Sequence, residues 1–268
     1  MKVFLWACAL VTISCTLCHG QEISVSPPSI EAEKKAVEFF ELGGACESAD
    51  YNCQVLNYTK AIEAYPGFVQ AYNNRGTGFQ IAGEYELAIK DFSRAIVIDP
   101  KFVQGYYNRA VLKASHNELQ AAIADYGKAI ELSPDLLLAY IGRGNAFLKD
   151  KNYDLAIRDF NKAIAIEPAL AQTYFNRGLA YFFKSQIDPA AADFTKAIAL
   201  DPQLSLAYLT RGKCLELKGD RFGALSDLTK FIELEPRDAR GYKMRAAAYS
   251  RFGDLAKAAA DEKKAAEL

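Results

Sequence analysis

The sequence predicts an all-α protein, an α-solenoid of stacked antiparallel helical hairpins, and three regularities support this prediction. Prolines recur every 34 residues, alanines and tyrosines recur with the same period, and apolar residues between them follow helical spacing. A fixed period of this length is typical of proteins in which each repeat buries its apolar face only against its neighbours. The recurring prolines are Pro66, Pro100, Pro134, Pro168, Pro202 and Pro236, and the alanines are Ala88, Ala122, Ala156, Ala190, Ala224 and Ala258.

The composition of the 268 residues excludes several function classes. Lys and Arg number 32 against 33 Asp and Glu, and this balance leaves no basic excess for binding nucleic acid. Only two histidines occur, and one of them, His19, lies in a segment that we expect to be removed. The sequence therefore predicts no metal site that needs two imidazoles, no cofactor and no nucleic-acid partner.

Residues 1–20 resemble a secretory signal peptide. Met1 and Lys2 precede an apolar stretch that ends in small and polar residues and is short for a helix that spans a membrane. Cleavage after Gly20 would leave a mature chain in the periplasm or secreted. Lipid attachment at Cys15 is the alternative, and we expect membrane association only in that case.

Residues 21–34 are expected to form a short tether, because they are polar and contain a Pro pair. Cys46 and Cys53 flank a short loop-like run, which predicts a local disulfide in an exported protein. Two free thiols in a reducing compartment are the alternative. Cys214 occupies an apolar helical position and is expected to be a buried small side chain.

Residues 69–102 show how one repeat is built. Tyr72 and Phe79 are spaced for one face of a first helix, Gly83 ends that helix, and a second helix runs to Pro100. Small residues on the facing stripes of the two helices allow their close approach. Each repeat is therefore predicted to be an antiparallel helical hairpin.

This pattern resembles the tetratricopeptide repeat (TPR) family. The resemblance covers residues 35–268 and implies a right-handed superhelix that binds protein partners. The first repeat departs from the pattern, with an irregular first helix, and is interpreted as an N-terminal cap. About seven repeats are expected, at 35–68, 69–102, 103–136, 137–170, 171–204, 205–238 and 239–268.

Arginines on the first helices also recur every 34 residues, and an aspartate follows each arginine by 16 residues. In an antiparallel hairpin the two side chains fall at about the same height. A charge on a core-facing position is costly unless paired, and a guanidinium can hold a carboxylate through two hydrogen bonds. We therefore expect six structural ion pairs: Arg75 with Asp91, Arg109 with Asp125, Arg143 with Asp159, Arg177 with Asp193, Arg211 with Asp227 and Arg245 with Asp261.

The opposite face of the first helices is expected to line the concave side of the superhelix, from about Asn74 to Leu217, where TPR proteins bind extended peptides or helices. The face is apolar for a surface. Two interpretations stay open, namely packing between repeats and an exposed patch that binds a partner. The candidate residues are Asn74, Tyr107, Asn108, Val111, Ile141, Asn145, Leu148, Phe175, Asn176, Leu179, Phe182 and Phe183.

Three of these, Asn74, Asn108 and Asn176, directly precede an arginine at equivalent positions. An asparagine amide can donate to and accept from one peptide unit, so a row of them can hold a peptide backbone. The row is locally similar to that in the TPR superhelix of the O-linked N-acetylglucosamine transferase. Gly142 and Thr210 interrupt the row. The alternative to peptide binding is that an Asn before the Arg is only a recurrent sequence feature of this repeat variant.

The sequence favours a non-enzymatic function. It has no Gly-rich phosphate loop, and His116 lies alone in a turn between helices, where a solvated residue is the ordinary interpretation. The basic clamp by which chaperone-binding TPR proteins capture a C-terminal carboxylate is not found. In its place, the C-terminal repeats contain a loose basic patch of Lys213, Arg240, Lys243 and Arg251.

These observations predict an exported scaffold or adaptor that binds a peptide or helix of a protein partner. The alternative is a structural subunit that forms homo-oligomers. In that case another copy, or the chain's own N-terminal segment, would fill the concave face.

Overall fold

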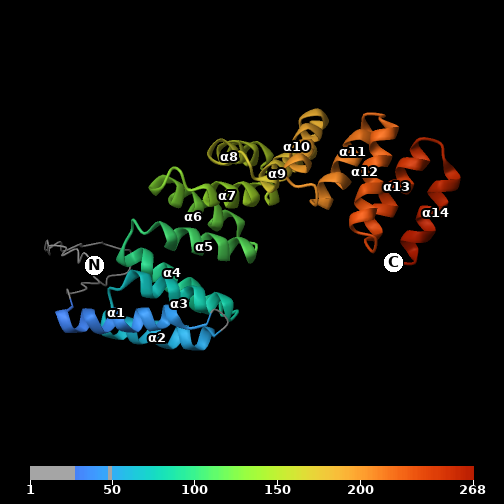
Figure 1. Ribbon diagram of the computed structural model, residues 1–268. Helices are drawn as coiled ribbons and strands as arrows, with labels where there is room; N and C mark the ends of the chain where they lie inside the picture. Colours follow the sequence, from blue (N-terminus) through green and yellow to red (C-terminus); the bar gives the residue numbers. More distant parts are fainter. Residues whose placement is uncertain (1–27, 48–49) are drawn as a thin grey trace. The chain divides into compact units, whose positions relative to one another are not determined.

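The protein forms fourteen helices and no strand within residues 28–47 and 50–268, which the computed structural model describes (Figure 1). The expected signal peptide lies outside these residues, as do residues 21–27 of the expected tether. In the described part of the chain, no helix has the length and apolar character needed to cross a membrane. The helices are α1 (Ile30–Ala45), α2 (Tyr51–Ala64), α3 (Val69–Ile81), α4 (Tyr85–Ile98), α5 (Val103–Ser115), α6 (Leu119–Leu132), α7 (Leu137–Lys149), α8 (Tyr153–Ile166), α9 (Ala171–Phe183), α10 (Ile187–Leu200), α11 (Ser205–Leu217), α12 (Arg221–Leu234), α13 (Ala239–Arg251) and α14 (Leu255–Ala266).

Helix α1 differs from the expectation in two ways. Ser29 accepts a hydrogen bond from the Ala32 amide and caps the helix, so residues 30–34 belong to α1 and not to a tether. Glu31 and Glu33 in the first turn add a favourable interaction with the helix dipole. The first helix of the first repeat was also expected to be irregular, but α1 is a continuous helix of 16 residues.

The chain divides into two compact units, and the boundary between Gly105 and Tyr106 lies within α5. In unit 1, α1 packs against α2, α2 against α3, and α3 against α4. In unit 2, the hairpins α7–α8, α9–α10, α11–α12 and α13–α14 each pack internally and against the helix that precedes them. The first helices α7 and α9 also contact each other, as do α11 and α13. Each unit is therefore a stack of helical hairpins, and the predicted all-α solenoid is confirmed.

In the six hairpins from α3–α4 to α13–α14, the turn contains one residue with left-handed backbone geometry. In three hairpins this residue is a glycine, such as Gly83 with a φ of 79°, for which the conformation has no steric cost. The other three hairpins use Asn117, Lys151 and Ser185 at the equivalent position, with φ angles of 65°, 63° and 60°. The stacking therefore preserves the turn even where the sequence has no glycine to indicate it.

The core of the hairpins places a small residue against an aromatic ring. A Cβ atom at Gly144 in α7 would lie 2.7 Å from the ring of Phe160 in α8, so only glycine fits there. Phe160 and the neighbouring Ala156 are fully buried. The same arrangement recurs in the pairs Gly76 with Phe92 and Gly178 with Phe194. This close packing fixes the height of each first helix on its second helix.

Candidate functional site

The structure places all six arginine–aspartate pairs in contact. In each pair, arginine Nε and Nη2 donate to the two carboxylate oxygens over 2.6–2.9 Å. The aspartates are buried, from 1% exposed at Asp159 to 7% at Asp261. Both carboxylate oxygens are occupied by the guanidinium, so this geometry favours a structural role for the pairs.

Most of these arginines also contact the preceding hairpin. In unit 2, the Nη1 atoms of Arg177, Arg211 and Arg245 donate to a side-chain oxygen 2.6–3.1 Å away on the second helix before them. In unit 1, Arg75 Nη1 donates to Thr59 Oγ1 in the same way. The acceptors lie 16 residues before each arginine, and a polar residue at that spacing is the signal that could have revealed them. The acceptors in unit 2 are Asn161, Thr195 and Thr229.

Hydrogen bonds to the aspartates favour the charged form of the paired arginines. Hydrogen bonds to Asp193 and Asp227 raise the pKa of Arg177 and Arg211, and burial opposes that effect. At Arg75, burial is the largest single influence and lowers the pKa, but the hydrogen bond and charge of Asp91 outweigh it. The guanidinium groups therefore stay protonated and act as fixed links between helices.

Two of the candidate binding residues belong to the core. Phe175 is only 6% exposed and packs against Phe194, with 5.7 Å between ring centroids. Asn176 is 8% exposed. Phe175 packs against α10 and Asn176 bonds to Asn145 of α7, so these two residues pack inside the protein and do not line an open groove as expected. Helical spacing could not separate these positions from the accessible ones on the same helix.

The other candidates of α7 and α9 form a surface that we call the first-helix face. Phe183 is 55% exposed and Asn145 is also exposed, whereas the remaining members are half-buried. Phe183 stacks on Tyr153 at 5.7 Å between ring centroids and meets Phe182 edge-on at 5.9 Å, so its position is well defined. Leu217 of α11 occupies the same repeat position as Phe183 and is 40% exposed. The first-helix face consists of Ile141, Asn145, Leu148, Leu179, Phe182, Phe183 and Leu217.

The asparagine row is partly satisfied inside the protein. Asn176 Nδ2 donates to Asn145 Oδ1, and Gln172 Nε2 donates to Asn176 Oδ1, each over 2.8 Å. This chain of amides joins α7 to α9 and uses the polar atoms of Asn176. Asn145, the exposed member, is the residue of this chain that a partner can reach.

The remaining candidates lie on α3 and α5 and are half-buried. On α5, Tyr107 packs near Tyr126 at 6.0 Å between ring centroids, and burial raises its pKa; Asn108 and Val111 follow it on the same helix. Asn74 belongs to unit 1, where its Oδ1 accepts from Asn73 Nδ2 over 3.2 Å. Among the candidate residues, the structure joins those of α7 and α9 by a hydrogen bond, from Asn176 to Asn145.

The cysteines and the histidine of the described residues are Cys46, Cys53, Cys214 and His116. Cys46 and Cys53 form a disulfide between α1 and α2. Cys214 is fully buried, and burial raises the pKa of its thiol to about 11, with a small opposing effect of Lys218. His116 is exposed, with Nδ1 3.0 Å from the Leu112 carbonyl oxygen. Within the described residues, no group of three His, Cys, Asp or Glu side chains is arranged to hold a metal ion.

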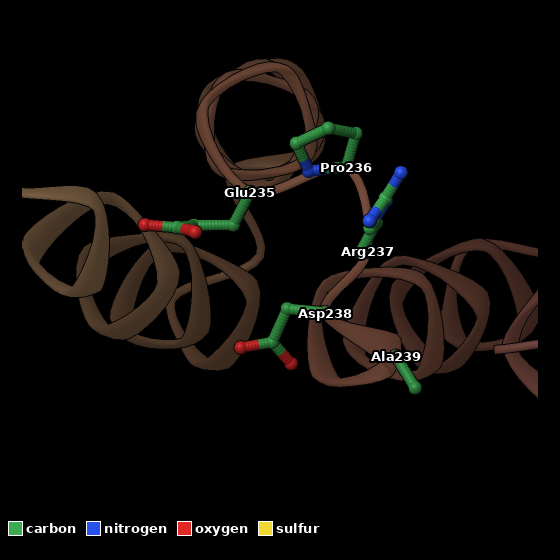
Figure 2. Close-up of a pocket in the computed structure, with 5 residues that line it drawn as sticks. All are labelled: Glu235, Pro236, Arg237, Asp238 and Ala239. Atoms are coloured by element: carbon green, nitrogen blue, oxygen red, sulfur yellow. The ribbon is translucent and has the colours of Figure 1, made fainter.

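Two open hollows lie at turns and not on the first-helix face. Five consecutive residues, Glu235 to Ala239, line the hollow at the α12–α13 turn, and Figure 2 shows their side chains pointing in different directions. The second hollow lies at the α13–α14 turn, beside Arg221. A small-molecule site needs several groups that converge on one point, and neither hollow provides a set of this kind.

Comparisons with known proteins agree with this architecture. A TPR repeat family model matches residues 113–151 and 144–185, and a tetratricopeptide repeat model matches residues 69–102 and 171–204. No curated protein sequence matches the chain.

Several solved structures are similar. MamA 41-end from Desulfovibrio magneticus RS-1 superimposes with a TM-score of 0.60 at 26% identity, over 63% of this chain and 95% of that chain. YrrB, described as a TPR protein with an unusual peptide-binding site, gives 0.58 at 28% identity, over 66% and 91%. A TPR protein from Parabacteroides merdae shares the fold, with a TM-score of 0.62 at 21% identity over 89% and 92%. With the repeats, the hairpin stack and these matches in agreement, the chain is a tetratricopeptide repeat protein.

Proposed function

We propose that this protein is a non-enzymatic scaffold or adaptor that binds a peptide or helix of a protein partner on the first-helix face of unit 2. The observation that carries the proposal is Phe183, an aromatic side chain that is 55% exposed although it is held in place by Tyr153 and Phe182. Exposed and well-ordered aromatic residues are typical energetic centres of protein interfaces. Leu217, at the equivalent position of α11, is also exposed, at 40%.

Two further observations support the proposal. Leu148 and Phe182 add half-buried apolar side chains on α7 and α9, two helices that contact each other, and apolar surface of this kind marks interaction sites. The similarity to YrrB supports a peptide as the form of the partner.

We also propose that the protein works in an exported compartment, in the periplasm or secreted. The expected signal peptide and the Cys46–Cys53 disulfide support this location, because disulfides persist in oxidising environments. Fractionation of the native host, with detection of the N-terminal residue of the mature chain, tests it. A chain that keeps Met1 in the cytosol would contradict it.

The binding proposal is tested by selecting random peptides of about a dozen residues, displayed on phage, against the full chain. We expect enrichment of specific peptides, and about a tenfold loss of their affinity in the double variant Phe183→Ser, Leu217→Ser. Phe222→Ser is the matched control, because Phe222 is an 85% exposed aromatic residue on α12, a second helix. Absence of enrichment, or equal loss in the control, would contradict the proposal.

Self-assembly is a second candidate function, favoured by a different observation. Phe222 is 85% exposed and Leu255 69% exposed, at the starts of the second helices α12 and α14. Exposed apolar side chains at the terminal repeats are suited to contact another copy. Light scattering of the full chain distinguishes the two functions: an oligomer that becomes a monomer in Phe222→Ser, Leu255→Ser supports self-assembly, and a monomer rejects it.

A further inference from the structure

Three first-helix positions that are apolar in α9 are each occupied by a charged residue in one of the next two hairpins. Leu179 and Phe182 correspond, 34 residues later, to Lys213 and Glu216 of α11. Phe183 corresponds to Arg251 of α13 two repeats later. Basic side chains therefore occupy two of the six equivalent positions in α11 and α13, and the other four are Glu216, Leu217, Ala247 and Ser250.

A buried carboxylate holds the first part of the basic region in place. Glu216 is 3% exposed, and Lys213 Nζ donates to its Oε2 over 2.7 Å. Arg251 Nη1 lies 3.5 Å from the other carboxylate oxygen. Because one carboxylate serves two cations, Lys213 and Arg251 are brought together across α11 and α13, and one positive charge remains uncompensated.

Helix α13 continues this region. Arg240, Lys243 and Arg251 recur at spacings of three and eight residues, which place them along one side of the helix. The side chains of Arg240 and Arg251 are 62% and 52% exposed, and Lys243 is exposed. Asp238 pairs with Arg240 and the charge of Glu235 also acts on Arg240, so the region contains four basic side chains against three acidic ones. We call Lys213, Arg240, Lys243 and Arg251 the basic patch.

We infer that the partner segment contains acidic residues beside its apolar ones, so that apolar side chains contact the first-helix face and carboxylates contact the basic patch. The inference rests on the proposed function and specifies the partner: an acidic, partly apolar peptide. Complementary charge is the argument, because an exposed basic surface repels basic segments and favours acidic ones in encounter and orientation. The charges are exposed, so salt weakens this part of the interaction.

The experiment uses the displayed random peptides described above. Peptides are selected in parallel on the full chain and on the double variant Arg240→Glu, Lys243→Glu. The control variant is Lys162→Glu, Lys196→Glu, which makes the same charge change at two exposed positions of the second helices α8 and α10. Circular dichroism checks that all three proteins have equal helix content.

We expect the peptides enriched on the unchanged chain and on the control to combine apolar with acidic residues. Their affinity should fall by about tenfold in Arg240→Glu, Lys243→Glu and should weaken in the unchanged chain as the salt concentration rises. Neutral or basic enriched peptides, or an equal affinity for both variants, would overturn the inference while leaving the proposed function intact. No enrichment on any variant would overturn the proposed function, and the inference with it.

Discussion

Two junctions between neighbouring hairpins of unit 2 differ in one hydrogen bond. At the α10–α11 junction, Arg211 donates to Asp227 in its own hairpin and to Thr195 Oγ1 in the preceding helix. At the α6–α7 junction, the position 16 residues before Arg143 is Gly127, which has no side chain to accept. The difference separates two roles of the arginine: the aspartate fixes the hairpin, and the earlier polar residue fixes the hairpin to its neighbour.

The largest expected effect comes from removing the aspartate that pairs with Arg143 or Arg211 inside its own hairpin. Asp159→Ala leaves a partly buried guanidinium at Arg143 without its bidentate partner, and we expect a loss of about 3–5 kcal/mol in the free energy of unfolding. Asp227→Ala should cost less, because Arg211 keeps its bond to Thr195. Urea denaturation followed by circular dichroism measures both. Equal losses would show that the inter-hairpin bond adds nothing.

A smaller loss is expected when the α10–α11 junction is made like the α6–α7 junction. Thr195→Val keeps the shape of the side chain and removes the acceptor of Arg211, which should cost about 1–2 kcal/mol. Thr210→Val is the control, because Thr210 Oγ1 bonds only to the carbonyl oxygens of Leu206 and Ala207 in its own helix. The two variants should differ in their urea midpoints, and identical midpoints would count against the role of Thr195.

The reverse change should strengthen the α6–α7 junction. A Cβ atom at Gly127 would lie 3.6 Å from Arg143 Nη1, which is ordinary contact distance, so a hydroxyl there can accept from the arginine. We compare Gly127→Thr with Gly127→Val, because the two side chains have the same shape and similar helix propensity. The threonine variant should be more stable by about 1 kcal/mol. No difference would mean that Arg143 does not use the added acceptor.

The smallest expected effect is on the reactivity of Cys214 in α11. Only the thiolate reacts, and burial raises the thiol pKa to about 11, so alkylation should be slow at neutral pH and should speed up as the pH rises. Thr195→Val should increase the rate modestly by loosening α11, and Gly127→Thr should not. Mass spectrometry of the peptide that contains Cys214 measures the rate. An equal increase in both variants would contradict a local effect.

Sequence spacing predicted the parts of the structure that lie within one repeat. An interval of 16 residues puts an arginine and an aspartate at the same height of an antiparallel hairpin, so the six pairs could be proposed without coordinates. Interactions between repeats were harder to predict. In the sequence, the acceptors Thr195 and Asn161 look like ordinary polar surface residues. Only the packing of successive hairpins brings each of them next to the arginine of the following hairpin.

The candidate binding face was only partly predictable for a related reason. Phe175 and Phe183 both lie on α9 and both look apolar and outward-facing in the sequence, but Phe175 packs on Phe194 and Phe183 remains exposed. Helical periodicity assigns a direction to each side chain, whereas burial depends on what the neighbouring helices place in that direction. Helix α1 was missed at its start because its cap, Ser29, lies inside a stretch that was assigned to the tether from composition.

The most direct test of the proposed function is the dissociation constant of one selected peptide for three forms of the full chain. We predict that the unchanged chain and Phe222→Ser bind the peptide with equal affinity, and that Phe183→Ser, Leu217→Ser binds it about tenfold more weakly with its helix content unchanged. Equal affinity of all three forms would contradict the assignment of the binding site to the first-helix face.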